Sequence, residues 1–384
     1  MSDNELVLLR ESVSAAFKAM SPPAEVRRQM ETAGGWDAGV WRRLSRELGL
    51  AGLAVPEEHG GGGFSLVELG VVFEEAGREL LCAPLFATAA LAIPLLLALD
   101  DPDARTRYLP GLCDGSLVGT AVTADAAGRH APGGALVELS VRAGGPVLTG
   151  EVSFVVDGAS ADLILVPVRA EDGLAVYAVE SGAPGLTVTP LVTLDLTRKQ
   201  AALVLDGVPA TRIGTGDAAE AFGMALDVAR ALLAAEQAGG AARCLDSAVA
   251  YAKTRIQFGR PIGGFQAIKQ KLADLLIQVE SARSAAIAAA QAAADALAPE
   301  DAADRVGGLT GLPTLPVVAA VAQLYCSEAY VRVAADNIQL HGGIGFTWEH
   351  DAHLYYKRAW TSRELLGRPE EHADRLAGLL TAAP

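Results

Sequence analysis

The sequence predicts an α+β fold in three parts: an N-terminal all-helical domain, a middle small β-barrel or sandwich, and a C-terminal four-helix bundle. Apolar residues recur at helical spacing up to about residue 115, and short β-branched runs broken by Gly, Pro and Asp follow. Helical spacing then returns in long Ala-rich segments. We therefore place the three domains at 1–116, 117–213 and 214–384.

The N-terminal domain shows the helical period in two segments. The apolar positions that carry it are Leu6, Leu9, Val13, Leu66, Leu69, Val72, Phe73 and Ala76. The most apolar stretch, 83–99, is shorter than the roughly 20 residues that a bilayer span needs, and it contains Pro84 and Pro94. We therefore expect a buried helix at this stretch and no association with a membrane.

The middle domain is predicted from short runs with β-branched residues. These runs are LVGTAVTA, ALVELSVR, DLILVPV, LAVYAVE, LTVTPL and QAALVLDGV. Six or seven short strands of this kind are typical of a small barrel or a sandwich. The sequence leaves both forms open.

The C-terminal domain contains three long helical patterns, at 216–255, 265–298 and 313–340, followed by a shorter pair. Their Ala-rich faces allow close approach of the helices, and short connections favour an antiparallel bundle. Residues 299–313 collect Pro, Gly and Asp and predict a surface connection between two of the long helices.

The composition excludes several classes of partner. A net charge of -15 argues against a broad basic surface, so nucleic acid and anionic membranes are not expected partners. The first residues, MSDNELVLLRESVSAAF, are acidic where a signal peptide is basic, which predicts a cytoplasmic protein. The cysteines form no CxxC pair, so we expect reduced core residues at Cys82, Cys113, Cys244 and Cys326.

Three motifs occur in the order found in one known family. GLAGLAVPEEHGGGGFSLVELGVVFEEAGREL spans 49–80, YAKTRIQFGRPIGGFQAIKQKLADL spans 251–275, and DNIQLHGGIGFTWEHDAHLYYKRAW spans 336–360. Together they resemble the acyl-CoA dehydrogenase family over essentially the whole chain. The resemblance implies an oxidoreductase that uses FAD to convert an acyl-CoA thioester to the 2-enoyl-CoA.

Two of these motifs have residues suited to a dinucleotide. Arg255 offers a planar fork of donors for a pyrophosphate, Phe258 an apolar face, and Gln266 a neutral hydrogen bond. Glycines without a Cβ let the backbone approach a ligand closely. The resemblance implies that the following residues contact FAD bound to a neighbouring subunit: Arg255, Phe258, Gln266, Gln339, Leu340, His341, Gly342 and Gly343.

Ordinary structural roles are alternatives for these residues. Arg255 alone could form a surface ion pair, and Gly342 with Gly343 could cap a helix. Trp348 and the other aromatic residues of the third motif are expected to serve packing. The histidines have no metal-ligand spacing, so no metal site is predicted.

The chain departs from the family at the catalytic base. The family's reaction needs a Glu that takes the α proton while the flavin accepts a hydride. Aligned by the motifs, the two positions that carry this Glu fall on Ala229 and Leu366, neither of which accepts a proton. Their companions Asp227 and Arg230 are kept, which implies a retained role in binding substrate.

Nearby acids are not convincing replacements for the base. Asp227 and Glu364 lie two residues from the base positions, about 200° around a helix axis. Glu236 lies seven residues beyond Ala229, on the same face but displaced by roughly 10 Å. We expect all three to be ordinary solvated or cap-associated acids.

The middle domain departs from the family as well. TADAAGRH (123–130) stands where the family has a sequence close to TEPxxGSD, so its Glu, Pro and Ser are lost. A segment whose aromatic ring and hydroxyl flank the flavin corresponds here to 154–157, with Phe154 but no hydroxyl. The degraded elements all belong to the subunit's own active site.

We therefore interpret the chain as the non-catalytic β-type subunit that completes a partner's FAD site. It is similar to the actinobacterial heteromeric acyl-CoA dehydrogenases of sterol and lipid degradation, which implies an α2β2 assembly with a catalytic acyl-CoA dehydrogenase subunit. An acyl-CoA substrate and reoxidation by an electron-transfer flavoprotein follow from the same resemblance. The alternatives are a self-sufficient homotetrameric flavoenzyme with an unusual base and a cofactor-free scaffold of the same fold.

Overall fold

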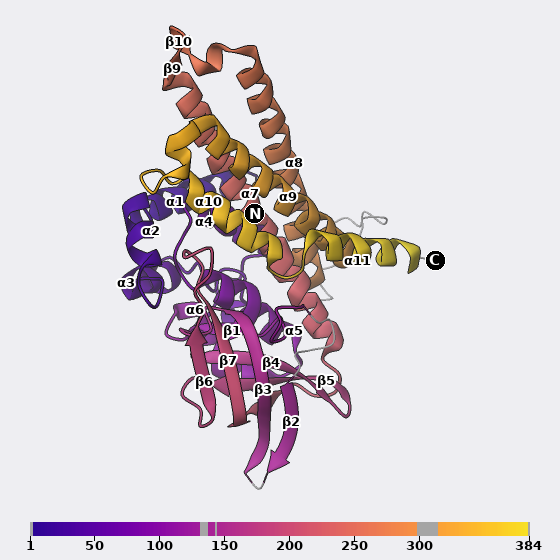
Figure 1. The fold of residues 1–384 in the computed structure, drawn as a ribbon. Coiled ribbons are helices and arrows are strands. Elements are labelled where there is room, and N and C mark those ends of the chain that lie inside the picture. Colours follow the sequence, from indigo (N-terminus) through magenta and orange to yellow (C-terminus); the bar gives the residue numbers. More distant parts are fainter. Residues whose placement is uncertain (1–2, 131–136, 143, 298–313, 383–384) are drawn as a thin grey trace. The chain divides into compact units, whose positions relative to one another are not determined.

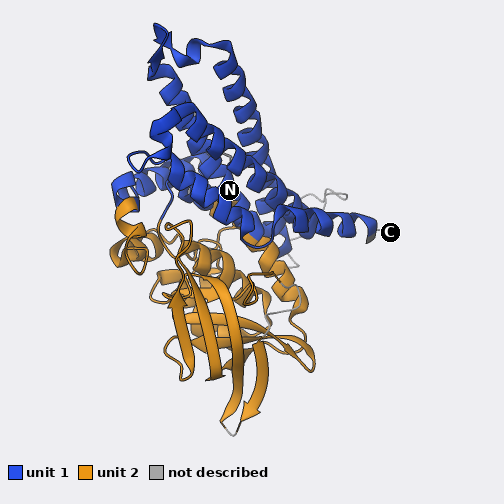
Figure 2. Ribbon diagram, viewed as in Figure 1, with its two compact units in different colours: residues 1–26, 70–81, 230–384 blue, residues 27–69, 82–229 orange. Residues whose placement is uncertain are grey.

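The computed structural model describes residues 3–130, 137–142, 144–297 and 314–382. The described chain forms two compact units (Figures 1 and 2). Unit 1 contains residues 1–26, 70–81 and 230–384, and unit 2 contains residues 27–69 and 82–229. The division into domains at 1–116, 117–213 and 214–384 follows the type of secondary structure and stays a prediction.

Unit 1 is helical, and it includes the three long helices that the sequence predicts. Its helices are α1 (Asp3–Met20), most of α4 (Leu66–Arg78), most of α7 (Ala219–Thr254), α8 (Gln266–Leu297), α9 (Leu315–His341), α10 (Ala352–Glu364) and α11 (Pro369–Ala382). The long helices α7, α8 and α9 run along one another in Figure 1. The predicted connection at 299–313 lies outside the described residues.

Small residues allow helices α4 and α7 to cross at backbone distance. A Cβ added to Gly77 would meet the carbonyl oxygen of Glu236, and one added to Gly239 would meet that of Glu74. Any larger side chain at either glycine would therefore push the two helices apart. The glycines thus determine how closely α4 and α7 pack.

A buried carboxylate joins three helices of unit 1. Glu74 on α4 accepts a 2.6 Å bond from Arg10 on α1 and a 3.0 Å bond from Arg283 on α8. Its side chain is only 6% exposed, so both arginines compensate a charge that would otherwise be costly to bury.

Unit 2 begins with short helices and ends in strands. The helical elements that lie wholly inside it are α3 (Ala38–Arg42), η1 (Arg43–Glu47), η2 (Glu57–His59), η3 (Phe86–Ala92), α5 (Ile93–Ala98) and α6 (Pro102–Asp114), while α2 (Pro23–Met30) spans the boundary between the units. Helix α6 starts where Asp101 accepts a bond from the backbone N–H of Ala104. It ends at Gly115, whose φ of 73° suits glycine.

The strands of unit 2 form two four-stranded sheets with the orders β1-β4-β5-β8 and β2-β3-β7-β6. The strands are β1 (Gly119–Ala121), β2 (Val137–Arg142), β3 (Gly145–Val156), β4 (Leu163–Ala170), β5 (Gly173–Glu180), β6 (Leu186–Pro190), β7 (Gln200–Pro209) and β8 (Thr211–Ile213). No ladder joins the two sheets in the described part of the chain. The barrel form of the prediction is therefore wrong, because both sheets keep their edge strands.

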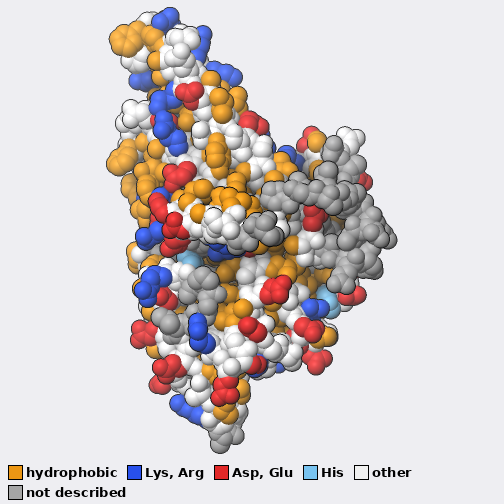
Figure 3. All heavy atoms as spheres, turned by 90° about the vertical axis from the view of Figure 1, so that its right-hand side faces the viewer, with side chains coloured by type: hydrophobic (Ala, Val, Ile, Leu, Met, Phe, Trp, Pro, Cys, Tyr) orange, Lys and Arg blue, Asp and Glu red, His pale blue; other side chains and the backbone are white. Residues whose placement is uncertain are grey.

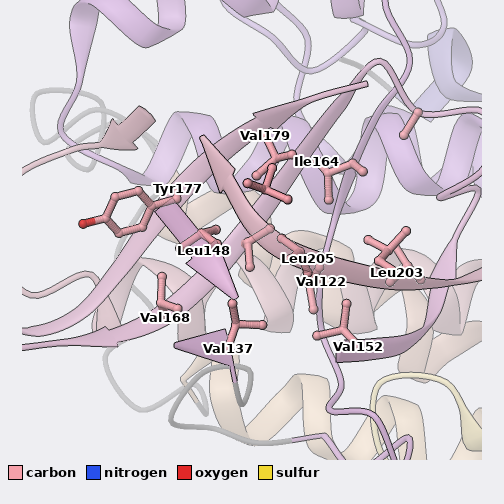
Figure 4. Close-up of a cluster of buried hydrophobic side chains, with 14 of the residues drawn as sticks. Val122, Val137, Leu148, Val152, Ile164, Val168, Tyr177, Val179, Leu203 and Leu205 are labelled. Carbon is pink, nitrogen blue, oxygen red and sulfur yellow. The ribbon is translucent and has the colours of Figure 1, made fainter. Parts of the chain in front are cut away.

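The two sheets share one apolar core (Figure 4). Side chains from both sheets point into it, among them Leu148, Leu203 and Leu205 from one sheet and Ile164 and Val179 from the other. Each of these five side chains is at most 2% exposed. The two sheets therefore pack face to face, and β4 and β5 are buried along nearly their whole length.

Candidate cofactor-contact site

The RIQFGRP motif forms a β-hairpin at one end of unit 1 (Figure 1). Strand β9 (Ile256–Gln257) pairs with β10 (Arg260–Pro261) across a two-residue turn. Both turn residues are left-handed, Phe258 with φ 51° and Gly259 with φ 76°. Glycine adopts this conformation readily, whereas phenylalanine is strained in it.

The hairpin holds Phe258 away from the helices. Its side chain is 91% exposed. Its ring meets Phe265 edge to face at 6.0 Å between centroids, and Arg260 lies over the Phe265 ring at 4.1 Å. At the top of Figure 3, at the height of this hairpin in Figure 1, apolar and basic side chains are exposed together.

Arg255 and Gln266 flank the hairpin on the two adjoining helices. The backbone N–H of Arg255 continues the helical pattern to Tyr251 at 2.8 Å, and its carbonyl accepts from Ile262 at 2.9 Å. Within the described residues, neither the Arg255 guanidinium nor the Gln266 amide has a side-chain hydrogen bond or ion pair, and both side chains are exposed. Their donors therefore face outward.

The QLHGG motif ends helix α9 and begins the turn η6 (Gly342–Phe346). Gly342 caps the helix with φ 64° and ψ −142°, a combination that is essentially restricted to glycine. A Cβ added to Gly342 or Gly343 would meet nothing within 4 Å. The backbone therefore requires the first glycine, and the open space beside both leaves room for a ligand.

The structure brings the two motifs together through an aromatic contact. The rings of Tyr251 and His341 lie 4.3 Å apart with an interplanar angle of 31°. The ring of His350, which follows His341 in the sequence, also lies 4.3 Å from the His341 ring between centroids. Sequence reasoning did not find Tyr251 or His350, although Tyr251 stands one helical turn before Arg255.

The eight predicted contact residues fall into two groups. Leu340 and His341 are buried, with exposures of 8% and 5%. The exposed group consists of Arg255, Phe258, Gln266, Gln339, Gly342 and Gly343. Those six residues provide a guanidinium, two amides, an aromatic ring and open backbone, a donor set that fits a pyrophosphate and an aromatic base.

The second base position lies in a tight, closed turn. Leu366 is fully buried and left-handed, with φ 62°. Its carbonyl accepts a 3.1 Å bond from the Arg230 side chain. The preceding carbonyls of Ser362 and Leu365 accept from Gln237 and Gln323, which are also buried. Side chains of α7 and α9 thus fix this turn by hydrogen bonds, and the side chain at the base position, Leu366, is apolar.

The three acids near the base positions have different surroundings. Glu236 is buried and pairs with Arg358 at 3.0 Å, which corrects the expectation of a solvated acid. Glu364 is exposed and pairs with Arg363 at 3.0 Å and Arg368 at 2.7 Å. In unit 2, Ala229 is fully buried, and Asp227 is only 2% exposed, so Asp227 is not solvated either.

The two degraded segments of the middle domain pack against each other in unit 2. Asp125 accepts backbone bonds from Ala127 and Arg129, and the side chain of Arg129 adds a third bond. The bonds from Arg129 hold the pKa of Asp125 below its ordinary value, although burial opposes this shift. A Cβ added to Gly128 would meet the ring of Phe154 at 2.8 Å, so this loop and the aromatic residue are in close contact.

Other features bear on the exclusions made from sequence. All four cysteines are buried, as predicted, and burial raises the pKa of Cys113 and of Cys326 to about 12. None of the described helices has the length and apolarity that crossing a bilayer requires. Over the same part of the chain, no cluster of three His, Cys, Asp or Glu side chains is placed to hold a metal ion.

Two family models match the chain. Residues 3–116 match the family model described as acyl-CoA dehydrogenase, N-terminal domain. Residues 219–379 match the model described as acyl-CoA dehydrogenase, C-terminal domain. The two models together cover more than half of the chain.

Similar proteins extend over nearly the whole chain. Acyl-CoA dehydrogenase IpdE2 of Mycolicibacterium smegmatis is 36% identical, with 97% of each chain covered. The ChsE4–ChsE5 complex from Mycobacterium tuberculosis has a TM-score of 0.85 at 28% identity, covering 100% of this chain and 99% of that one. A variant of the Tcur3481–Tcur3483 steroid ACAD has a TM-score of 0.81 at 30% identity, with 98% of each chain covered.

Proposed function

The chain belongs to the acyl-CoA dehydrogenase family, and on that premise we propose that it is the non-catalytic β-type subunit of a heteromeric enzyme. It completes the FAD site of a catalytic partner subunit in an α2β2 assembly. The assembly acts in the cytoplasm on an acyl-CoA thioester and produces the 2-enoyl-CoA.

One contrast supports this proposal above all. The side chains of Arg255, Phe258 and Gln266 point out of the chain, with no hydrogen bond or ion pair to any described residue. The positions of the catalytic base, Ala229 and Leu366, are instead apolar and fully buried. The chain has kept the groups that serve a neighbour and lost those that would serve itself.

Each retained group has a part in binding. FAD supplies the hydride acceptor of the reaction. Arg255 binds the pyrophosphate through its fork of donors, Phe258 covers an aromatic ring, and Gln266 and Gln339 add neutral hydrogen bonds. Asp227 and Arg230 remain proposed contacts for the acyl-CoA.

The similar proteins support the partner and the substrate class. The ChsE4–ChsE5 structure is a complex of two named components, and the Tcur3481–Tcur3483 protein is called a steroid ACAD. We extend both properties to this chain, which gives an acyl-CoA dehydrogenase partner and a sterol-derived acyl thioester as substrate. An electron-transfer flavoprotein is the proposed acceptor of the electrons.

Co-expression tests the proposal. The chain is purified alone and together with the product of a neighbouring acyl-CoA dehydrogenase gene, and the flavin absorbance and native mass are measured. We expect little FAD on the chain alone and a yellow α2β2 complex on co-expression. A yellow homotetramer of this chain that bleaches on addition of an acyl-CoA would overturn the proposal.

Arg255→Ala tests the contact itself within the complex. We expect weaker FAD binding by roughly one to two orders of magnitude, because a charge-assisted bond to a phosphate is lost. Lys18→Ala is the control, since it removes another exposed cation from the same unit. Unchanged FAD binding in Arg255→Ala would favour a scaffold that keeps only the fold.

A further inference from the structure

We infer that His341 is a positioning residue that sets the glycine turn at 342–343 relative to the Arg255 end of helix α7. The inference rests on the proposed function, because it concerns the two elements assigned to the partner's FAD. His341 lies immediately before Gly342, yet its side chain is only 5% exposed. Its ring is therefore placed to act through its neighbours.

The ring of His341 contacts two other rings. The centroid of the Tyr251 ring lies 4.3 Å from that of His341, with an angle of 31° between the ring planes. The centroid of the His350 ring also lies 4.3 Å from that of His341, with an angle of 44°. Both contacts are tilted, and aromatic pairs at this separation are favourable by about 0.5–1.5 kcal/mol each beyond the burial of their area. The stack joins the end of α7, the end of α9 and the segment that leads into α10.

A hydrogen bond determines the orientation of the ring. Nδ1 of His341 lies 2.8 Å from the carbonyl oxygen of Asn337, one helical turn earlier. A carbonyl only accepts, so Nδ1 carries the hydrogen and donates it. This bond therefore keeps a hydrogen on Nδ1 and fixes the orientation of the His341 ring.

Both functional elements are built directly on this stack. Arg255 follows Tyr251 by one turn, and its backbone N–H bonds the Tyr251 carbonyl at 2.8 Å. On the other side, the turn η6 folds back so that a Cβ added to Gly345 would lie 2.9 Å from Cβ of His341. A shift of the His341 ring would therefore move the glycine turn and the arginine apart.

Two backbone amides report on the two sides of the stack. The N–H of Gly342 bonds the carbonyls of Ile338 and Gln339, and the N–H of Ile262 bonds the carbonyl of Arg255 at 2.9 Å. Amide hydrogen exchange of the purified chain measures the local opening of each. We expect His341→Ala to speed exchange about tenfold at both amides, because the contacts that couple them are lost.

Conservative variants separate the stack from the hydrogen bond. His341→Phe keeps an aromatic ring and should restore slow exchange at Ile262, whereas His341→Asn keeps a donor to Asn337 and should not. Tyr251→Ala should match His341→Ala, and the double variant should add little further. Trp348→Ala, an aromatic change in the same segment outside the stack, should leave both amides at wild-type rates.

The inference is overturned if His341→Ala speeds exchange at Gly342 alone.

FAD binding by the co-expressed complex tests whether His341 also affects the cofactor site. We expect His341→Ala to weaken it about tenfold and His341→Phe to restore it. If Arg255→Ala weakens FAD binding and His341→Ala does not, the inference fails while the proposed function stands. If neither variant has an effect, the proposed function fails, and the exchange rates still show whether the stack couples the two elements.

Discussion

Glu236 on α7 and Arg358 on α10 form a buried ion pair, with Oε1 of the glutamate 3.0 Å from Nη1 of the arginine. The two side chains are 6% and 4% exposed. Glu236 shares a helix face with Ala229, seven residues earlier in α7, so it is a candidate for a replacement base. Its pairing with Arg358 favours a structural role, which the next measurements test.

We expect Glu236→Ala to lower the free energy of unfolding by about 3–5 kcal/mol, because it removes the carboxylate paired with the buried Arg358 charge. Replacing both residues by methionine should cost much less. The exposed pair of Glu328 and Arg363 provides the control, and Glu328→Ala should cost at most about 1 kcal/mol. Urea unfolding measures these changes in the free energy of unfolding.

A complex carrying Glu236→Gln that folds normally but loses several orders of magnitude in rate would instead identify Glu236 as a base.

Phe258 occupies a turn position that asparagine or glycine would fill more easily. Its backbone is strained, with φ at 51°. Its side chain buries little surface in this chain, because the residue is 91% exposed. We expect Phe258→Asn to raise the free energy of unfolding by up to about 1 kcal/mol. The same variant should weaken FAD binding in the complex, because the aromatic contact is lost.

The control for this variant is Phe346→Asn, which replaces an exposed phenylalanine outside the left-handed region and should bring no gain in stability. Unfolding in urea and the fluorescence of released FAD measure the two effects. A Phe258→Asn protein that is less stable than wild type would show that the ring is part of the fold.

Gly77 and Gly239 are expected to be intolerant of even a methyl group. Gly77→Ala or Gly239→Ala places a Cβ against a backbone carbonyl of the other helix, so we expect a loss of about 1–3 kcal/mol or more. Gly223→Ala is the matched control in α7, where nothing lies within 4 Å of the added Cβ. That substitution should stabilise the chain by up to about 1 kcal/mol, because alanine is the better helix former. Thermal unfolding compares the three, and equal effects would contradict the close crossing of α4 and α7.

Asp336 links helices α8 and α9 in a pH-dependent way. It bonds Lys271 at 2.5 Å and Arg332 at 2.9 Å. Burial alone would raise the pKa of Asp336, but the bonds from Lys271 and Arg332 outweigh it and leave the pKa below its ordinary value. A lowered pKa in the folded state stabilises the chain at pH values above the unfolded pKa, which is about 3.9.

The difference in unfolding free energy between wild type and Asp336→Asn isolates this contribution from other carboxylates. We expect the difference to be constant from neutral pH to about pH 5 and to shrink as the pH falls below about 4. Urea unfolding at a series of pH values measures it. A difference that stays unchanged down to the acid transition would mean that Asp336 contributes no linkage.

The periodicity of apolar residues predicted most helices and strands, but it missed strand β3. The predicted helix at 265–298 agrees with α8 at Gln266–Leu297, because 32 residues of regular spacing leave little ambiguity. The strand at Gly145–Val156 was not predicted as a run of its own. Its pairing with β7 shifts register between Leu148 and Gly150 and between Val152 and Val155, so bulges interrupt the alternation.

Sequence by itself determined the family, the order of helices and strands, and the absence of a carboxylate at Ala229 and Leu366, since each of these depends on residue identity and local spacing. Tertiary structure alone decided that His341 lies buried against Tyr251 and that Glu236 pairs with Arg358. These partners are far apart in the chain, and only the packing of α7 against α9 and α10 brings them into contact. Spacing along a helix predicts the direction of a side chain, whereas its burial and its charge partner depend on what the rest of the fold places opposite it.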